Sequence, residues 1–137
     1  MKTSKLFRFT LFVVVLVLAS LACGFSASTA NITNAYMAKD EAGEQKTSDY
    51  APGDQSFYCY FDLNNAPDDT VVKSVWTLVS ADGYESNSEI DTADITGGGN
   101  TYYFTLNRSA DAWPVGKYKI DLYINDNLAQ TLNFEVK

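Results

Sequence analysis

The sequence predicts an all-β fold for residues 31–137, with two packed sheets of about seven strands in total. Three observations predict it. Short runs alternate between apolar and polar residues, which is the pattern of a half-buried strand. These runs are rich in β-branched and aromatic residues, and clusters of turn-forming residues separate them. No segment after residue 31 has the period of an amphipathic helix, and short strands at this spacing are typical of a β-sandwich.

The first clear strands lie between residues 57 and 80. The segment FYCYFDL, residues 57–63, places its apolar residues on one face, namely Phe57, Cys59, Phe61 and Leu63. Its other face holds Tyr58, Tyr60 and Asp62, because strand side chains alternate. Turn formers in NNAPDD follow. The β-branched segment TVVKSVWTLVS then places Val72, Trp76 and Leu78 on one face.

The second half of the chain repeats the pattern. Residues 81–100 predict a weak, irregular strand that ends in the glycine turn TGGGN, residues 96–100. TYYFTLN follows, with Tyr103 facing away from Phe104. The NDN turn, residues 125–127, predicts a hairpin between the last two strands. These strands contribute two inward rows: Tyr118, Ile120, Leu122 and Ile124, then Leu128, Leu132, Phe134 and Val136.

Three residues of this pattern resemble those of immunoglobulin-like domains. Cys59 corresponds to the strand B cysteine, Trp76 to the strand C tryptophan and Tyr118 to the tyrosine of the corner before strand F. The chain departs from the family at Ile120, where antibody domains have their second cysteine. The resemblance therefore implies that Cys59 is a small core residue without an inter-sheet disulfide. It covers roughly residues 31–137 and implies an architecture, not an activity.

Residues 1–22 have the layout of a secretory signal peptide. A basic start (Lys2, Lys5 and Arg8) precedes an apolar run over residues 9–21, and small residues crowd its end. This run is shorter than the roughly 17–25 residues of a spanning helix. A retained anchor over residues 6–22 is the alternative, if the bilayer is locally thinned.

The end of this segment, ASLAC, resembles the lipobox of bacterial lipoproteins. Ala22 is the small residue directly before Cys23, although Ser20 stands where the family prefers leucine. The resemblance implies that Cys23 is acylated and becomes the mature N-terminus. The protein would then be exported and lipid-anchored to the cell membrane on its extracytoplasmic side, with residues 23–30 as a short tether. A disulfide between Cys23 and Cys59 is the alternative, since exported compartments permit it.

Composition excludes several functions. Beyond residue 22, 17 acidic and seven basic residues give a net charge of −10, which argues against nucleic-acid binding. The chain has no histidine, which removes histidine-dependent nucleophilic catalysis and the usual zinc sites. The glycine turn lacks the lysine and helix of a phosphate-binding loop. The pairs Asp68–Asp69 and Asp91/Asp94 match no EF-hand loop. No enzyme, cofactor or metal is predicted.

Three non-catalytic functions remain. An interaction module for a protein of the envelope or extracellular space is the first, and a carbohydrate-binding module is the second. The third, a secreted protease inhibitor, rests on a loose resemblance to chagasin-type inhibitors, whose Asn-Pro-Thr-Thr-Gly loop is missing here.

For the first two functions the candidate surface is Tyr58, Tyr60 and Tyr103, with Asp62 at its rim. Strands B and E are neighbours in the resembled fold, so these tyrosines should meet on one outer face. The alternative is that they serve only as cross-strand partners within the sheet.

Overall fold

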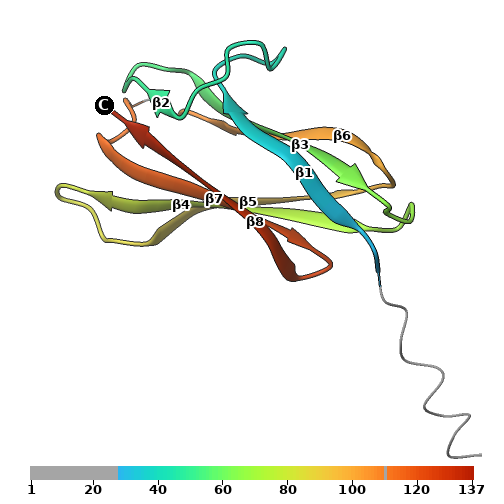
Figure 1. The fold of residues 1–137 in the computed structure, drawn as a ribbon. Coiled ribbons are helices and arrows are strands. Elements are labelled where there is room, and N and C mark those ends of the chain that lie inside the picture. Colours follow the sequence, from blue (N-terminus) through green and yellow to red (C-terminus); the bar gives the residue numbers. More distant parts are fainter. Residues whose placement is uncertain (1–27, 110) are drawn as a thin grey trace, which may run out of the picture.

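The computed structural model describes residues 28–109 and 111–137, which form two sheets packed face to face (Figure 1). The predicted signal peptide and Cys23 lie outside the described residues. Eight strands are present: β1 (Asn31–Ala38), β2 (Asp49–Tyr50), β3 (Ser56–Asn64), β4 (Val71–Ala81), β5 (Ser88–Thr96), β6 (Asn100–Asn107), β7 (Gly116–Ile124) and β8 (Asn127–Val136). Within the described part of the chain, no helix has the length and apolar character needed to cross a membrane.

The sheets differ in width. One has three strands in the order β1-β3-β6, and the other has five in the order β2-β8-β7-β4-β5. Neighbouring strands are antiparallel, except that β2 runs parallel to β8. The predicted sandwich is confirmed with eight strands. β1 was not assigned to any segment by the sequence pattern, and neither was β2, whose two residues are too few to show an alternating pattern.

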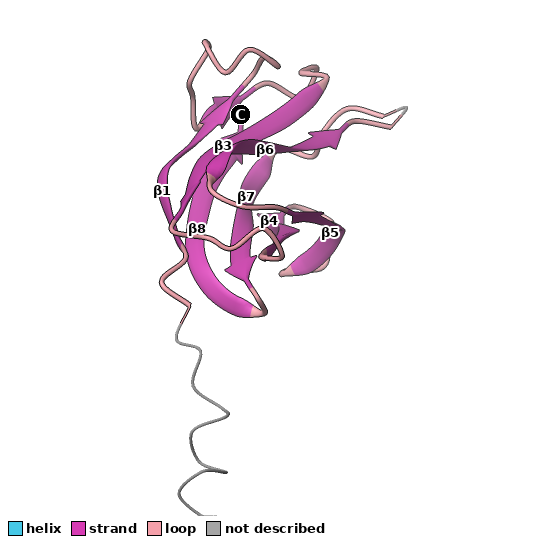
Figure 2. Cartoon of the chain, turned by 90° about the vertical axis from the view of Figure 1, so that its right-hand side faces the viewer, coloured by secondary structure: helices cyan, strands magenta, loops and turns pink. Residues whose placement is uncertain are grey.

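The connections gather at two poles (Figure 1). The loops after β3, β5 and β7 lie where the described chain begins, which we call the N-terminal pole. The loops after β1, β4 and β6 lie at the opposite end with Lys137, which we call the C-terminal pole. β1 lies against β8 at one long side of the sandwich, and β6 and β5 are the edge strands at the other side (Figure 2).

The core fills the space between the sheets. Cys59 on β3 and Ile120 on β7 belong to opposite sheets and are both fully buried. Trp76 on β4 pairs directly with Ile120 and is also buried. Cys59 is a free cysteine, and burial raises the pKa of its thiol to about 12. The residue therefore packs as a small apolar group.

Tyr118 makes the backbone contact expected of a tyrosine corner. Its hydroxyl donates a hydrogen bond of 2.6 Å to the carbonyl of Pro114, four residues upstream. Burial raises the pKa of this hydroxyl to about 12, and Tyr84 adds to the shift. Next to it, Gly116 lies so close to β4 that an added Cβ would stand 2.2 Å from the Ser80 carbonyl oxygen. A side chain at position 116 would therefore push β7 away from β4.

One inward prediction is wrong. Leu128 is 58% exposed, although it continues the alternating row of Leu132, Phe134 and Val136. The register of β7 with β8 shifts between Leu122 and Tyr123. A single-residue shift moves the side chains beyond it to the other face, so Leu128 faces solvent beside the β7–β8 turn.

Candidate functional site

The outer face of the three-stranded sheet gathers four tyrosines, which we call the tyrosine face: Tyr36, Tyr58, Tyr60 and Tyr103. Tyr60 of β3 pairs with Tyr36 of β1 on one side and with Tyr103 of β6 on the other. The centroid of the Tyr60 ring lies 5.4 Å from that of Tyr36 and 5.1 Å from that of Tyr103, and the rings of both pairs are stacked. Tyr58 lies 6.1 Å from Tyr103 with tilted rings. The rings thus form one continuous aromatic surface across three strands.

The members of this face differ in exposure. Tyr103 is 40% exposed, whereas Tyr60 is only 9% exposed. Tyr58 and Tyr36 are half-buried. Tyr103 is therefore the most accessible member of the face, Tyr58 and Tyr36 are accessible in part, and Tyr60 supports them from below. The alternating pattern placed Tyr58, Tyr60 and Tyr103 on this face, and it carried no signal for Tyr36, which the prediction did not include.

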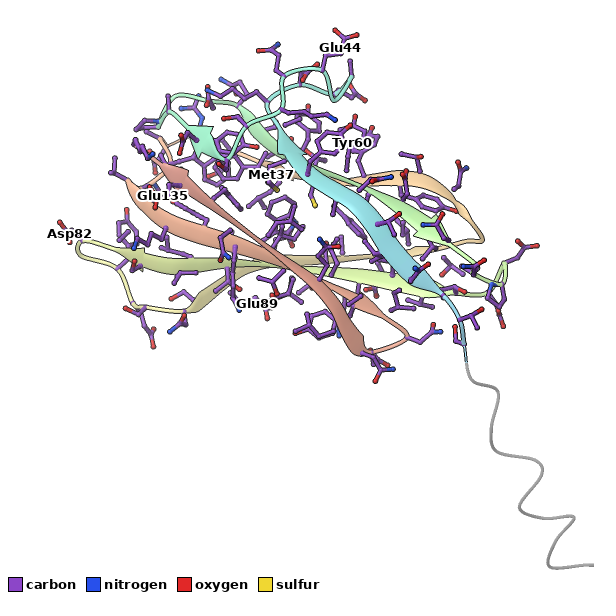
Figure 3. The ribbon with its side chains drawn as sticks, in the orientation of Figure 1. Met37, Glu44, Tyr60, Asp82, Glu89 and Glu135 are labelled. Atoms are coloured by element: carbon purple, nitrogen blue, oxygen red, sulfur yellow. The ribbon has the colours of Figure 1, made fainter. Side chains whose placement is uncertain are left out.

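Residues 39–46, the 39–46 loop, cover Tyr60. The Asp40 carboxylate accepts hydrogen bonds from the N–H groups of Glu44 (3.2 Å) and Gln45 (2.7 Å), which folds the loop back on itself. Gly43 has φ +69° and lies against the rings of Tyr36 and Tyr60. Glycine adopts this left-handed conformation without strain and leaves room for the rings. Figure 3 shows the loop, with Glu44 near its tip, above Tyr60.

Polar groups of the loop fix the tyrosine hydroxyls. The Tyr60 hydroxyl donates to the Glu41 carbonyl, and the Tyr103 hydroxyl donates to the Glu41 carboxylate at 3.0 Å. This bond to Glu41 raises the pKa of Tyr103, and burial together with nearby charges raises that of Tyr60. Lys46 Nζ lies 3.9 Å from the centroid of the Tyr36 ring, a distance at which a cation–π attraction operates. The raised pKa values keep the Tyr60 and Tyr103 hydroxyls protonated at neutral pH, so both can donate their hydrogen bonds to Glu41.

Asp62 lies on the same outer face, two residues beyond Tyr60. Its carboxylate accepts hydrogen bonds from the Thr101 hydroxyl (2.6 Å) and the Asn34 amide (2.8 Å). These bonds to Thr101 and Asn34 lower the pKa of Asp62. The carboxylate thus ties β3 to both of its neighbours and extends the tyrosine face with a polar, charged end.

The other candidate groups, the Asp91/Asp94 pair and the glycine turn, do not form a site in the described residues. Asp91 pairs with inward-facing Trp76 and Asp94 with Lys73, so the two carboxylates face opposite sides of β5. Within the described residues, no three metal-ligating side chains come together. The glycine turn packs on the β3–β4 loop: the Gly97 N–H donates to the Thr70 carbonyl, and an added Cβ on Gly98 would lie 2.4 Å from Asp68 Oδ1. The turn therefore joins two loops.

Trp113 is a core residue that the sequence prediction did not identify. Its ring stacks on Phe57 with centroids 4.3 Å apart, and its Nε1–H donates to the Asp54 carbonyl at 2.8 Å. It closes the C-terminal pole of the core. In the sequence, Trp113 is followed by Pro114, Val115 and Gly116, which lead into β7. This turn before the strand is the only local feature that indicates a core position for the tryptophan.

Comparisons with known proteins bear on the fold. No protein-family model matches the chain, and no curated protein is similar to it at a significant level. Among solved structures, an immunoglobulin-like protein from Pseudomonas aeruginosa has a TM-score of 0.53 and 15% identity, covering 82% of this chain and 100% of that one.

Two further matches are to parts of longer enzyme chains. The alkylpurine DNA glycosylase AlkC from Pseudomonas fluorescens has a TM-score of 0.54 and 13% identity over 80% of this chain, and the match spans 31% of the glycosylase. A β-glucosidase from Kluyveromyces marxianus has a TM-score of 0.48 over 15% of its length. At these identities the likeness concerns the fold alone. The described chain is an immunoglobulin-like β-sandwich.

Proposed function

We propose that this chain is an exported lipoprotein whose immunoglobulin-like domain is a non-catalytic binding module. Acylation of Cys23 would hold it on the extracytoplasmic side of the cell membrane, and the tyrosine face would contact a protein partner. The signal-like residues 1–22, the Ala22–Cys23 junction and the acidic charge of the remainder support this export and anchoring.

The observation that carries the binding function is the tyrosine face itself. Tyrosine is enriched at interfaces because its rigid ring gives contact area and its hydroxyl gives a hydrogen bond. Here Tyr103 offers 40% of its surface beside Tyr58. The 39–46 loop holds the supporting rings in place, so little conformational freedom is lost on binding.

A carbohydrate is the second candidate ligand. The observation that favours it is the carboxylate of Asp62 on the same face as the tyrosine rings, with Thr101 and Asn34 beside it. Sugar recognition uses ring stacking together with such polar groups. The acidic rim favours a protein with basic residues equally well, and the test below separates the two ligands.

The test replaces the accessible tyrosines and spares the buried one. In the variant Tyr58→Ser with Tyr103→Thr, capture of the partner from envelope extract should be lost, while the melting temperature falls by only a few degrees. Tyr60 stays because its removal would leave a cavity below the 39–46 loop. A glycan array with the same material reports sugar binding separately.

Tyr123→Ser is the matched control. Tyr123 is a half-buried strand tyrosine on the five-stranded sheet, with Lys73 Nζ 5.0 Å from its ring centroid. This variant should capture the partner as the unmodified protein does. Unchanged capture by the Tyr58/Tyr103 variant would show that these tyrosines are structural and that the binding site lies elsewhere.

A further inference from the structure

The long side of the sandwich formed by β6 and β5 is open. The three-stranded sheet ends at β6, and within the described residues no strand pairs with the second edge of β6. Such an edge presents unpaired backbone N–H and C=O groups to another chain. β6 pairs with β3 over eight consecutive residues, from Asn100 to Asn107, without a register shift. It is therefore a regular template for a further strand.

The five-stranded sheet extends beyond this edge and leaves part of its inner face uncovered. Three core residues of β4, namely Val72, Ser74 and Trp76, pair with Ile95, Ala93 and Asp91 of β5. Residues directly opposite one another share a face of the sheet, so these β5 side chains point inward. Asp91 and Ala93 are nevertheless exposed. A fourth strand beside β6 would lie over them, as neighbouring strands are about 4.8 Å apart.

The other free edges are poorer templates. β1 has a register shift between Thr33 and Tyr36, and Asn34 has a positive φ of 50°. Such a bulge interrupts the ladder. The outer edge of β5 is regular, but β5 is exposed on both faces, so a strand added there would bury little apolar surface. The edge of β6 combines regular backbone with a face to cover.

The turn of the β4–β5 hairpin and its β5 strand, which borders the open side, carry only acidic charge, and Asp91 is the carboxylate on the inner face of β5. Residues 82–94, which cover the β4–β5 turn and most of β5, include five acidic and no basic residues. Asp82 lies at the turn of this β4–β5 hairpin (Figure 3). Among the described ion pairs, none involves these five carboxylates. Asp91 accepts a hydrogen bond only from a backbone neighbour, Thr92, among the described contacts. Like charges oppose pairing of this side with a second copy, whereas a basic segment is attracted to it.

We infer that the free edge of β6 accepts an extended, lysine- or arginine-bearing segment of a partner protein as a fourth strand. Its backbone pairs with β6, and a basic side chain of the segment faces Asp91 on β5. Its outward side chains lie beside Thr101, Tyr103 and Thr105. Strand addition of this kind takes affinity from main-chain hydrogen bonds and specificity from alternate side chains. The inference rests on the backbone edge of β6 and on Asp91, although the added strand would also lie beside Tyr103 of the tyrosine face.

The test uses a fluorescent ten-residue peptide that alternates valine and lysine, added to the full chain in detergent. We expect saturable binding and slowed amide exchange in Asn100–Asn107. A peptide with glutamate in place of lysine should not bind. N-methylation of every second residue removes the amide donors along one edge of the peptide. One of the two methylation frames should therefore abolish binding, and the other should retain it.

Protein variants separate charge from backbone pairing. Asp91→Asn should weaken peptide affinity about two- to fivefold at low salt, the range for an exposed charge pair. Asp69→Asn, which removes an exposed carboxylate of the β3–β4 loop, should not change it. Partner capture that depends on Tyr58 and Tyr103, without peptide binding, would leave the proposed function standing and overturn this inference.

Three further results would overturn it: no saturable peptide binding, equal binding by both methylated frames, or exchange protection on β1 or β5 in place of β6. Concentration-dependent protection of β6 in the protein alone would identify a second copy as the occupant.

Discussion

Cys59 shows how burial decides the chemistry of one residue. The side chain is fully buried and the pKa of its thiol is raised to about 12, so almost no thiolate exists at neutral pH. Thiol reagents should label it only after denaturant is added. Cys59→Ala should cost about 1–2 kcal/mol and Trp76→Ala about 3–5 kcal/mol, measured by chemical unfolding. Rapid labelling of the folded protein would show that Cys59 faces outward.

Asp62 makes stability depend on pH. Its pKa is lowered in the folded state by Thr101 and Asn34, so its stabilising effect is complete above its unfolded pKa of about 3.9. The effect is lost as pH falls through the lower folded value. Asp62→Asn should therefore lower the melting temperature at pH 7, and the difference from the unmodified protein should shrink below about pH 4. A difference at pH 2.5 as large as that at pH 7 would exclude this linkage.

At the scale of elements, the β7–β8 hairpin depends on its two turn residues. Asn125 and Asp126 both have positive φ, 45° and 66°, as a two-residue type I′ turn requires. Asp126 forms an exposed ion pair with Lys73, which both Asp126→Gly and Asp126→Ala remove. The two variants therefore differ mainly in the backbone strain at residue 126. The free energy of unfolding of Asp126→Gly, measured with denaturant, should exceed that of Asp126→Ala by about 1 kcal/mol. Equal stability would mean that the turn relaxes to another conformation.

The same elements show what the sequence could predict. Alternation identified the inward residues of β3, β4, β6 and β7, because side-chain direction in a regular strand depends only on position along the chain. It failed at Leu128 and at β1, where register shifts interrupt the period, and at β2, whose two residues have no period.

The tyrosine face was predicted in part for a related reason. The pattern gave the face of each strand, but the covering of Tyr60 depends on contacts of the 39–46 loop. Those contacts come from Asp40, Glu41 and Gly43, which are distant from Tyr60 in sequence. Local patterning contains no information on how such a loop folds back over a sheet.

For the whole molecule, the main prediction concerns the attachment at Cys23. If Cys23 is acylated, the mature protein should partition into the detergent phase, and Cys23→Ser should release it into the aqueous phase with an unchanged melting temperature. The unchanged melting temperature is expected because residue 23 precedes β1. Mass spectrometry of the mature N-terminus checks the same point directly. A lipid-free mature protein that begins at another residue would exclude the lipoprotein assignment.

The position of β1 also determines how the domain responds to mechanical load. β1 starts at the N-terminal pole and pairs with β3 from Asn31↔Asn64 to Ala38↔Tyr58. When the N-terminus is held and a partner on the tyrosine face is pulled away along the strands, the force acts parallel to β1. The hydrogen bonds between β1 and β3 are then strained together, as in a shear joint, and they do not open one after another. If the protein is anchored at Cys23 as proposed, β1, the first strand after the anchor in the sequence, would also transmit tension to a partner on the tyrosine face.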